Sequence, residues 1–425
     1  MKFLLQSKNF QFYIFSFLPF TLITGPFLAD LSIVLISCIF LYVVIKEQRY
    51  YFLYSWFSKI FFLWYTLLLL SSFISSDPFF SLQSSLFYFR FGLFALAIWQ
   101  ILEDRQNNFK LFFYILLISF IILIFDGYLQ FLSGYNIFGN PYLYEQRLSS
   151  LFGDEYILGK YLSYLFPLLF ALIIKMDFQK NFFIYIFLIL LCLTDIIIYL
   201  TGERTAFGLL VLSTVSIILF TEKWKLIRLI SFCLSITLII FLTFSNQSAK
   251  FRMVDHTLNQ TQIISEDGTL NDLDEIIVFS DHHQTMYSKA YNIFLQNMVL
   301  GSGPKMYRKL CNDSKYGNSN ELSCSTHPHN YYLQLLAEGG IIGILPIIFI
   351  FLYTSYYLLK KLSMKLIKKK IIINDYMTCL LICFLVILWP VIPSGNFFNN
   401  WLSILIYLPV GFFLFEVNQK KYNKF

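Results

Sequence analysis

Twelve apolar stretches recur along the chain, and each is about as long as a helix that crosses a bilayer. They cover residues 10–24, 27–45, 57–76, 79–101, 109–132, 156–174, 182–200, 203–220, 226–244, 330–358, 371–390 and 397–417. About 20 mostly apolar residues cross the hydrocarbon layer as a helix. The first stretch is short, and it forms either a span of its own or an interrupted pair with the second. The sequence therefore predicts an all-α, polytopic membrane protein with about 12 transmembrane helices.

The composition supports this class and excludes an ordinary soluble enzyme. Of the 425 residues, 57% are apolar and only 13% are charged, whereas soluble domains carry about 25% charged residues. In a soluble protein a formal net charge of +7 would suggest nucleic acid as a partner. In a membrane protein the position of each charge relative to the bilayer matters more, so we expect membrane lipid and no nucleic acid around this chain.

The basic residues predict the orientation of the spans. With a cytoplasmic N-terminus, 21 of the 32 Lys and Arg residues fall on the inner side, against seven acidic residues, as the positive-inside rule requires. Both termini are then cytoplasmic, and the polar segments 133–155 and 245–328 are periplasmic. The opening stretch runs into another span without an A-x-A site, so we expect no cleavable signal peptide. The predicted parts are helices 1–9 in residues 1–244, a periplasmic loop in 245–328, and helices 10–12 in 329–425.

The predicted large loop, between helices 9 and 10, contains the residues with recognisable chemistry. Cys311 and Cys324 lie in a compartment that permits a disulfide, and the sequence leaves open whether they are bridged. Tyr287, Tyr291, Phe294 and Met298 recur at helical spacing, which predicts an amphipathic helix on the membrane surface or over a cavity. Residues 258–281 are acidic and aperiodic, and are typical of a flexible segment.

Arg90 and Lys160 are basic residues within predicted spans. Arg90 lies near the middle of its stretch, where it must face protein, water or an anionic ligand. The sequence allows a structural pair with Asp126 or Asp195, or a substrate-binding role. Lys160 stands near the outer start of the sixth span, and we expect its ammonium to reach the interface in a structural role.

Two arginines stand at the predicted outer ends of spans. Arg204 lies in the short turn Thr201–Phe207 beside Glu203, which either neutralises it in an interfacial pair or leaves it able to bind a ligand. Arg147 lies in a polar segment just before the sixth span. Alone, each is compatible with a plain interfacial role.

The most specific stretch begins at Cys324 and includes His327, His329 and Asn330 at the start of an apolar helix. The free N–H groups of a helix start favour an anion. No third His, Cys or Asp has spacing that supports a metal site with the two histidines, so we expect no metal. A histidine here is better suited to accept a proton. Because Pro328 separates the histidines, we do not expect both rings to enter one site.

This stretch resembles the signature of the O-antigen ligase and polymerase superfamily of bacterial envelope glycosyltransferases. The signature is His followed by Asn, Ser or Gln, then nine residues, Gly-x-x-Gly and a final Gly, Thr or Tyr. His329-Asn330, the nine residues 331–339 and Gly340–Gly343 match it, and Pro346 stands at the last position. The resemblance extends to Leu300-Gly301-Ser302-Gly303-Pro304, to the turns around Arg204 and Arg147, and to the large outer loop.

The resemblance implies a GT-C-like helical fold and an enzyme that transfers a polyprenyl-diphosphate-linked glycan, with no nucleotide-sugar donor, cofactor or metal. In this interpretation Arg204 and Arg147 hold the diphosphate with forked donors. His329 takes the proton of the acceptor hydroxyl. His327, Glu203 and Asn330 support them.

Three functions are open at this stage. The first is an O-antigen ligase, which joins the glycan to a lipid A–core acceptor. The second is an O-antigen polymerase, which uses a lipid-linked glycan as acceptor. The third is a transporter of lipid-linked sugars, which would place its polar groups near the midplane, whereas the titratable groups of this sequence gather on one side.

Overall fold

The computed structural model describes residues 2–105, 108–142, 147–178, 181–261, 280–317, 324–367 and 373–422. Helices dominate this part of the chain. Its only β-type pairing is an isolated bridge between Tyr135 and Pro141. The prediction of an all-helical polytopic membrane protein is confirmed.

The helices follow one another without an intervening sheet. Their bounds are α1 Lys2–Thr21, α2 Pro26–Lys46, α3 Trp56–Phe73, α4 Pro78–Ser85, α5 Phe89–Asp104, α6 Lys110–Ser133, α7 Leu158–Met176, α8 Asn181–Leu200, α9 Arg204–Phe220, α10 Lys225–Ser245, α11 Gln247–Lys250, α12 His256–Thr261, α13 Asp281–Gln296, α14 Tyr307–Leu310, α15 Tyr331–Leu366, α16 Asp375–Ile387 and α17 Asn400–Tyr422.

Each of the twelve predicted stretches overlaps a helix of the structure. In the described ranges, nine helical stretches are long and apolar enough to cross a membrane, with α4 and α5 counted together. α9 and α16 are apolar but shorter, at 17 and 13 residues. The predicted span 79–101 falls within one of these nine stretches, Pro78–Asp104, in which a turn at residues 86–88 divides α4 from α5.

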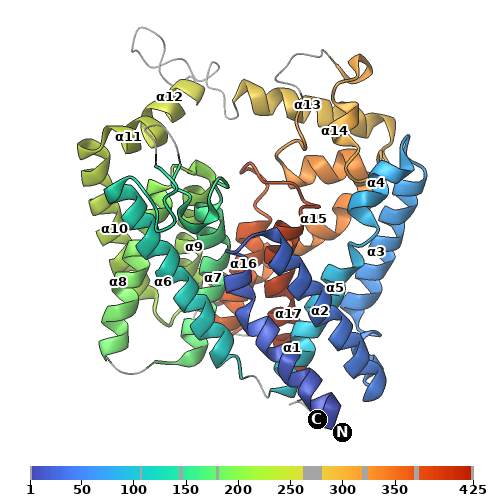
Figure 1. Cartoon of the computed structure of the whole chain (residues 1–425), viewed down its shortest axis with the longest axis horizontal. Coiled ribbons are helices and arrows are strands. Elements are labelled where there is room, and N and C mark those ends of the chain that lie inside the picture. The colour runs from blue at the N-terminus through green and yellow to red at the C-terminus, as the bar shows by residue number, and fades with distance from the viewer. Residues whose placement is uncertain are drawn as a thin grey trace.

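The helices form a bundle with two distinct ends (Figure 1). Both chain termini lie at one end, and α12, α13 and α14 lie at the other, which we call the loop end. Within the bundle α5 packs on α17, α7 packs on α16, and α8 packs on α10. Helices distant in sequence therefore share one core.

A buried ion pair joins α8 to α10. The guanidinium of Arg228 donates to both carboxylate oxygens of Asp195, at 2.8 and 2.9 Å, and both side chains are 0% exposed. Ser235 donates a further hydrogen bond to Asp195 at 2.9 Å. Charges away from water require such full pairing, and this pair fixes the helices on either side of α9.

α15 is kinked at Gly340, and a segment from the large loop fills the kink. In a regular helix the Ile341 N–H would bond to the carbonyl of Ala337. Here the Ile341 N–H instead donates to Met298 O at 2.8 Å. The freed carbonyl of Ala337 accepts a hydrogen bond from Ser302 N–H at 3.0 Å. Residues 298–303 thus satisfy the backbone groups that the kink frees, as an apolar environment demands.

Gly340 of the signature and Gly301 of the segment before it make this crossing possible. Gly340 has φ +63° and Gly301 has φ +70°, a region that residues with a Cβ rarely adopt. A Cβ on Gly301 would lie 2.5 Å from the backbone of residues 338–340, and one on Gly340 would lie 2.4 Å from Val299 O. The two backbones touch because neither carries a side chain at the crossing.

The predicted amphipathic helix is present as α13. The side that packs inside the protein carries Met286, Ala290 and Ile293, all 0% exposed. The predicted apolar face differs, since Tyr291 and Met298 are each 50% exposed. The predicted flexible acidic segment lies mostly outside the described residues.

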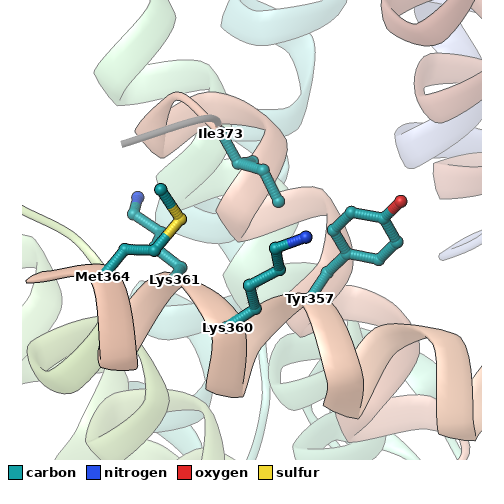
Figure 2. Close-up of a pocket in the computed structure, with 5 residues that line it drawn as sticks. All are labelled: Tyr357, Lys360, Lys361, Met364 and Ile373. Carbon is teal, nitrogen blue, oxygen red and sulfur yellow. The ribbon is translucent and has the colours of Figure 1, made fainter. Parts of the chain in front are cut away.

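A small pocket lies toward the C-terminal end of α15 (Figure 2). It is lined by Tyr357, Lys360, Lys361, Met364 and Ile373. The histidine motif begins just before the N-terminal end of the same helix, so this pocket is not part of the candidate site.

Candidate active site

His329 occupies a constrained position just before α15. Its backbone has φ +53°, and its carbonyl accepts a 2.8 Å hydrogen bond from Ser394 N–H in the loop between α16 and α17. The next residue, Asn330, caps α15 by accepting from the N–H groups of Tyr332 and Leu333 at 2.9 and 3.1 Å. Its Nδ2 donates to Pro390 O at 2.9 Å. Asn330 therefore uses its side chain to fix the backbone around His329.

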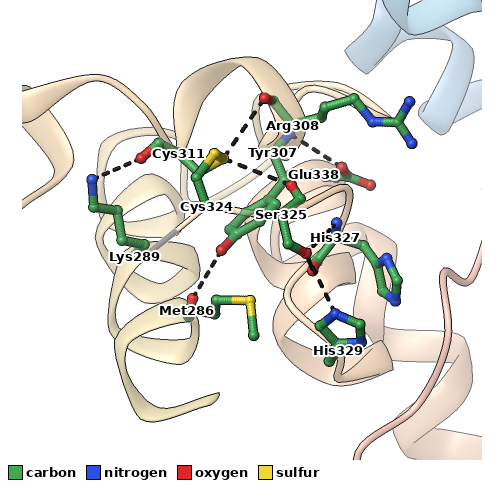
Figure 3. Close-up of a disulfide and its surroundings, with 10 residues drawn as sticks. All are labelled: Met286, Lys289, Tyr307, Arg308, Cys311, Cys324, Ser325, His327, His329 and Glu338. Atoms are coloured by element: carbon green, nitrogen blue, oxygen red, sulfur yellow. Dashed lines mark hydrogen bonds between the residues drawn. A yellow bond between two sulfur atoms is a disulfide. The ribbon is translucent and has the colours of Figure 1, made fainter. Parts of the chain in front are cut away.

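His327 and His329 lie together, contrary to the expectation drawn from Pro328. Their ring centroids are 4.1 Å apart, because the left-handed conformation of His329 turns its ring back toward His327. Ser325 links them, since its hydroxyl donates to His327 O at 2.7 Å and lies 3.4 Å from His329 Nε2 (Figure 3). His327 is 9% exposed, and its Nε2 is buried without a hydrogen-bond partner.

Both imidazoles are held in the neutral form. Burial lowers the pKa of His329, and together with the charges of His283, His282 and Lys160 it brings the pKa to about 4, against a backbone hydrogen bond with Ser394 that raises it. Burial, together with His329, lowers the pKa of His327 to about 3. Near neutral pH each ring therefore has a nitrogen lone pair that can accept a proton.

The sequence interpretation missed a third histidine of this cluster. His283 of α13 has its ring 5.7 Å from that of His329, and its Nδ1 lies 2.8 Å from Ser280 Oγ. Burial lowers the pKa of His283, with a contribution from the charge of Arg204. The signal was present, because four of the five His of the chain fall in the predicted loop 245–328 and the fifth, His329, directly follows it.

The disulfide between Cys311 and Cys324 joins the loop to the histidine segment. Their Cα atoms are 5.1 Å apart, and Ser325 follows Cys324 directly. Figure 3 shows the bridge beside Tyr307, whose N–H donates to the buried Glu338 of α15 at 3.1 Å. The bridge thereby ties α14 to the residues that precede His329.

Arg204 and Glu203 do not form the pair that their adjacency suggested. Glu203 Oε1 accepts from Gly159 N–H at 2.7 Å, at the start of α7. Burial raises the pKa of Glu203 while the charges of Lys160 and Arg147 oppose it. Arg204 donates to Thr257 Oγ1 at 3.2 Å. The backbone of the turn directs the two side chains to different neighbours.

Four cations gather at this end of α7 and α9. Arg147 and Arg252 are close enough to Arg204 to oppose its charge, and Arg252 packs over Gly202. Lys160 is within electrostatic range of Arg147, Glu203 and both histidines. The electrostatic neighbours of Lys160 are therefore Arg147, Glu203, His327 and His329, and those of Arg204 are Arg147, Arg252 and His283.

Arg90 lies apart from this cluster. Its Nη2 donates to Asp30 at 2.8 Å and joins α5 to α2. The predicted partners are otherwise engaged, because Asp126 accepts from Ser150 Oγ at 2.6 Å and Asp195 pairs with Arg228. The predicted pair of Arg90 with Asp126 or Asp195 is therefore wrong.

The described residues contain no group of three or more His, Cys, Asp or Glu arranged to hold a metal ion. The cluster consists mainly of neutral imidazoles and cations. Such a set can accept a proton and bind an anion.

Residues 186–348 match the family model described as O-antigen ligase. The matched residues are less than half of the chain, and they support the expected O-antigen ligase and polymerase family. The match runs from α8 through the Arg204 turn, the large loop and the histidine motif into α15. Together with the membrane-spanning helices, the match supports an O-antigen ligase-like or polymerase-like function in lipopolysaccharide biosynthesis. A search of curated proteins gave no match.

Proposed function

We propose that this protein is an O-antigen ligase of GT-C-like architecture. It transfers a polyprenyl-diphosphate-linked glycan to a lipid A–core acceptor at the periplasmic face of the inner membrane. One observation carries the proposal: the buried His327 and the half-buried His329 lie within electrostatic range of Lys160, which belongs to a cluster of cations at one end of the bundle. Hydroxyl deprotonation and diphosphate binding need these two kinds of group side by side.

The proposed reaction needs one base and a stabilised leaving group. The acceptor hydroxyl oxygen attacks the anomeric carbon of the donor glycan, and the bond from that carbon to the diphosphate oxygen breaks. The proton of the hydroxyl passes to His329, and the diphosphate departs on its polyprenyl carrier. Arg204 and Arg147 hold the departing phosphates with planar, permanently charged forks.

The other predicted residues position His329, Arg204 and Arg147 or balance their charge. His327 packs on the His329 ring and fixes its position. Glu203 orients the start of α7 and compensates part of the positive charge. Asn330 acts through the backbone as the cap of α15. Arg90 lies outside this site, because its guanidinium pairs with Asp30.

The periplasmic placement rests on charge asymmetry and on the two ends of the bundle. The termini share one end, and the histidine motif belongs to the opposite, loop end. If the lysine-rich inner segments face the cytoplasm, the site faces the periplasm. In intact cells a membrane-impermeant maleimide should label a Cys placed at Asn312, and labelling only after inner-membrane lysis would contradict this orientation.

Reconstitution tests the chemistry directly. Purified protein in nanodiscs, supplied with polyprenyl-diphosphate-linked glycan and lipid A–core, should form the glycan-bearing lipid A–core. His329→Ala should lose about 10²- to 10⁴-fold in rate, the usual contribution of a general base, while eluting and inserting as the wild type does. Transfer at the wild-type rate by His329→Ala would contradict the assigned base.

The choice of acceptor separates ligase from polymerase. With a lipid-linked repeat unit in place of lipid A–core as acceptor, a ligase should not lengthen the glycan chain. A polymerase should lengthen it. In cells, a deletion strain of a ligase should accumulate unattached polymer on its carrier. A core capped with a single repeat would indicate the polymerase.

A further inference from the structure

Lys160 is a cation whose surroundings do not neutralise it. It lies in the first turn of α7 and is only partly exposed. No carboxylate of the described residues lies within the 4.0 Å ion-pair distance of its Nζ. Two other enclosed cations have carboxylate partners: Arg228 pairs with Asp195 at 2.8 Å and Lys361 pairs with Asp375 at 2.6 Å. An ammonium enclosed at a membrane boundary without such a partner is costly.

The one carboxylate near Lys160 has other contacts. Glu203 Oε1 accepts from the N–H of Gly159 at 2.7 Å, at the start of the helix that carries Lys160. The single charge of Glu203 is also shared between Lys160 and Arg147. Two cations therefore face one carboxylate, and a positive charge is left over at this point.

The ammonium of Lys160 lies beside the loop that holds His329. A Cβ placed on Gly395 would be 3.7 Å from Lys160 Nζ. The preceding residue, Ser394, donates its N–H to His329 O at 2.8 Å. The charge of Lys160 acts on His327 and His329, as well as on Glu203 near Arg147. Lys160 is thus within electrostatic range of both histidines and of Arg147.

We propose that Lys160 binds the phosphate directly attached to the transferring sugar, so that the anomeric carbon lies next to His329. This inference rests on the proposed function and adds a residue to it. The arginines would hold the phosphate nearer the lipid, and Lys160, a compact point charge, would hold the sugar phosphate. The ligand supplies the missing negative charge, and a charge-assisted hydrogen bond forms in a site sheltered from water.

Binding of polyprenyl diphosphate to full-length protein in phosphatidylcholine nanodiscs tests this assignment. Lys160→Met keeps the length of the side chain and removes its charge, and we expect about a tenfold to hundredfold weaker affinity for polyprenyl diphosphate. Affinity for uncharged polyprenol should not change. Lys175→Met is the matched control, because Lys175 lies on the same helix, pairs with Glu416 at 3.5 Å, and should keep the wild-type affinity.

A double variant separates ligand binding from a purely structural role. If Lys160 served only to neutralise Glu203, then Lys160→Met/Glu203→Gln would recover the affinity for diphosphate. We expect no recovery, and recovery would overturn the proposal. Lipid A–core, which also carries phosphate, is measured separately, and a loss confined to that acceptor would equally overturn the assignment to the donor.

The same binding measurements distinguish an error in the role of Lys160 from an error in the proposed function. Wild-type protein that binds polyprenyl diphosphate no better than polyprenol would contradict the proposed donor itself. Wild-type protein that prefers the diphosphate, with Lys160→Met equal to it, would contradict only the role of Lys160. His329→Ala should bind the diphosphate normally and fail in transfer.

Discussion

Replacing Gly301 by Ala should damage the protein through the kink of α15, although the change adds one methyl group. Gly301 has φ +70°, and its N–H and Cα lie against the backbone of α15 at the kink. The new Cβ would lie 2.5 Å from Glu338 C and from the nitrogens of Gly339 and Gly340. These are backbone atoms, so no side-chain rotation can relieve the contact.

Two costs add to the expected magnitude. A residue with a Cβ in the left-handed region costs roughly 1–2 kcal/mol. Forcing an extra methyl group into a close-packed contact costs roughly 1–3 kcal/mol more. Gly301→Ala should therefore lower the free energy of unfolding by about 2–5 kcal/mol. Shifting residues 298–303 would also move α14 and the disulfide, and a displacement of about 1 Å at a reacting group can cost roughly 10²-fold in rate.

Gly134→Ala is the matched control for this measurement. Gly134 has φ +82°, but a Cβ there would have no atom within 4 Å, so only the conformational cost of about 1–2 kcal/mol applies. Both variants are unfolded by SDS titration in mixed micelles, and transfer is assayed on the same preparations. If Gly301→Ala loses no more stability than Gly134→Ala and transfers at the wild-type rate, the crossing does not need a glycine and this reasoning is refuted.

Three further outcomes follow from the site. Because burial lowers the pKa of His329 to about 4, the base form persists on acidification, so the transfer rate should stay level from pH 7 to about 5 and fall only below that; an apparent pKa near 6.5 would contradict this. Replacing Cys311 and Cys324 with Ser should reduce transfer and remove roughly 3 kcal/mol of loop-closure stabilisation, measured by SDS titration with Cys233→Ser as the control. Arg204→Lys and Arg147→Lys should each lower transfer at least about tenfold, because an ammonium offers no planar fork for a phosphate. Arg105→Lys, at the C-terminal end of α5, is the control and should not lower transfer.

The sequence predicted the helices because a lipid-facing span is specified locally. Length and apolar content decide it, and each predicted stretch overlaps a helix of the structure. The break between α4 and α5 was missed because Leu86 and Phe87 are as apolar as their neighbours. Hydropathy does not distinguish an apolar turn from an apolar helix when neither Pro nor Gly marks it.

The candidate site was predicted only in part because its pairings join distant helices. Arg90 lies 60 residues from Asp30, and no spacing rule connects two spans that far apart in sequence. Pro328 suggested separated histidine rings, but φ +53° at His329 reverses that geometry. Lys160 looked structural because a lysine at the start of a span usually reaches water.

The two halves of the candidate site stand on different parts of the fold. The histidines belong to α13, the disulfide-bonded loop and the start of α15, which the crossing at Gly301 and Gly340 fixes. The cations belong to α7, α9 and the segments beside them, which the buried pair of Arg228 and Asp195 helps to hold. Gly301 and Gly340 therefore have a structural role, because they position the helix that follows the proposed base, His329.

The two halves of the candidate site meet at Lys160 and at the loop that contains Ser394 and Gly395. Ser394 holds the backbone of His329, and a Cβ on Gly395 would lie 3.7 Å from Lys160 Nζ. A donor with its diphosphate on the cation half would present its sugar to the histidine half across this loop. The base and the leaving group can then stay on opposite sides of the anomeric carbon, as a displacement at that carbon requires.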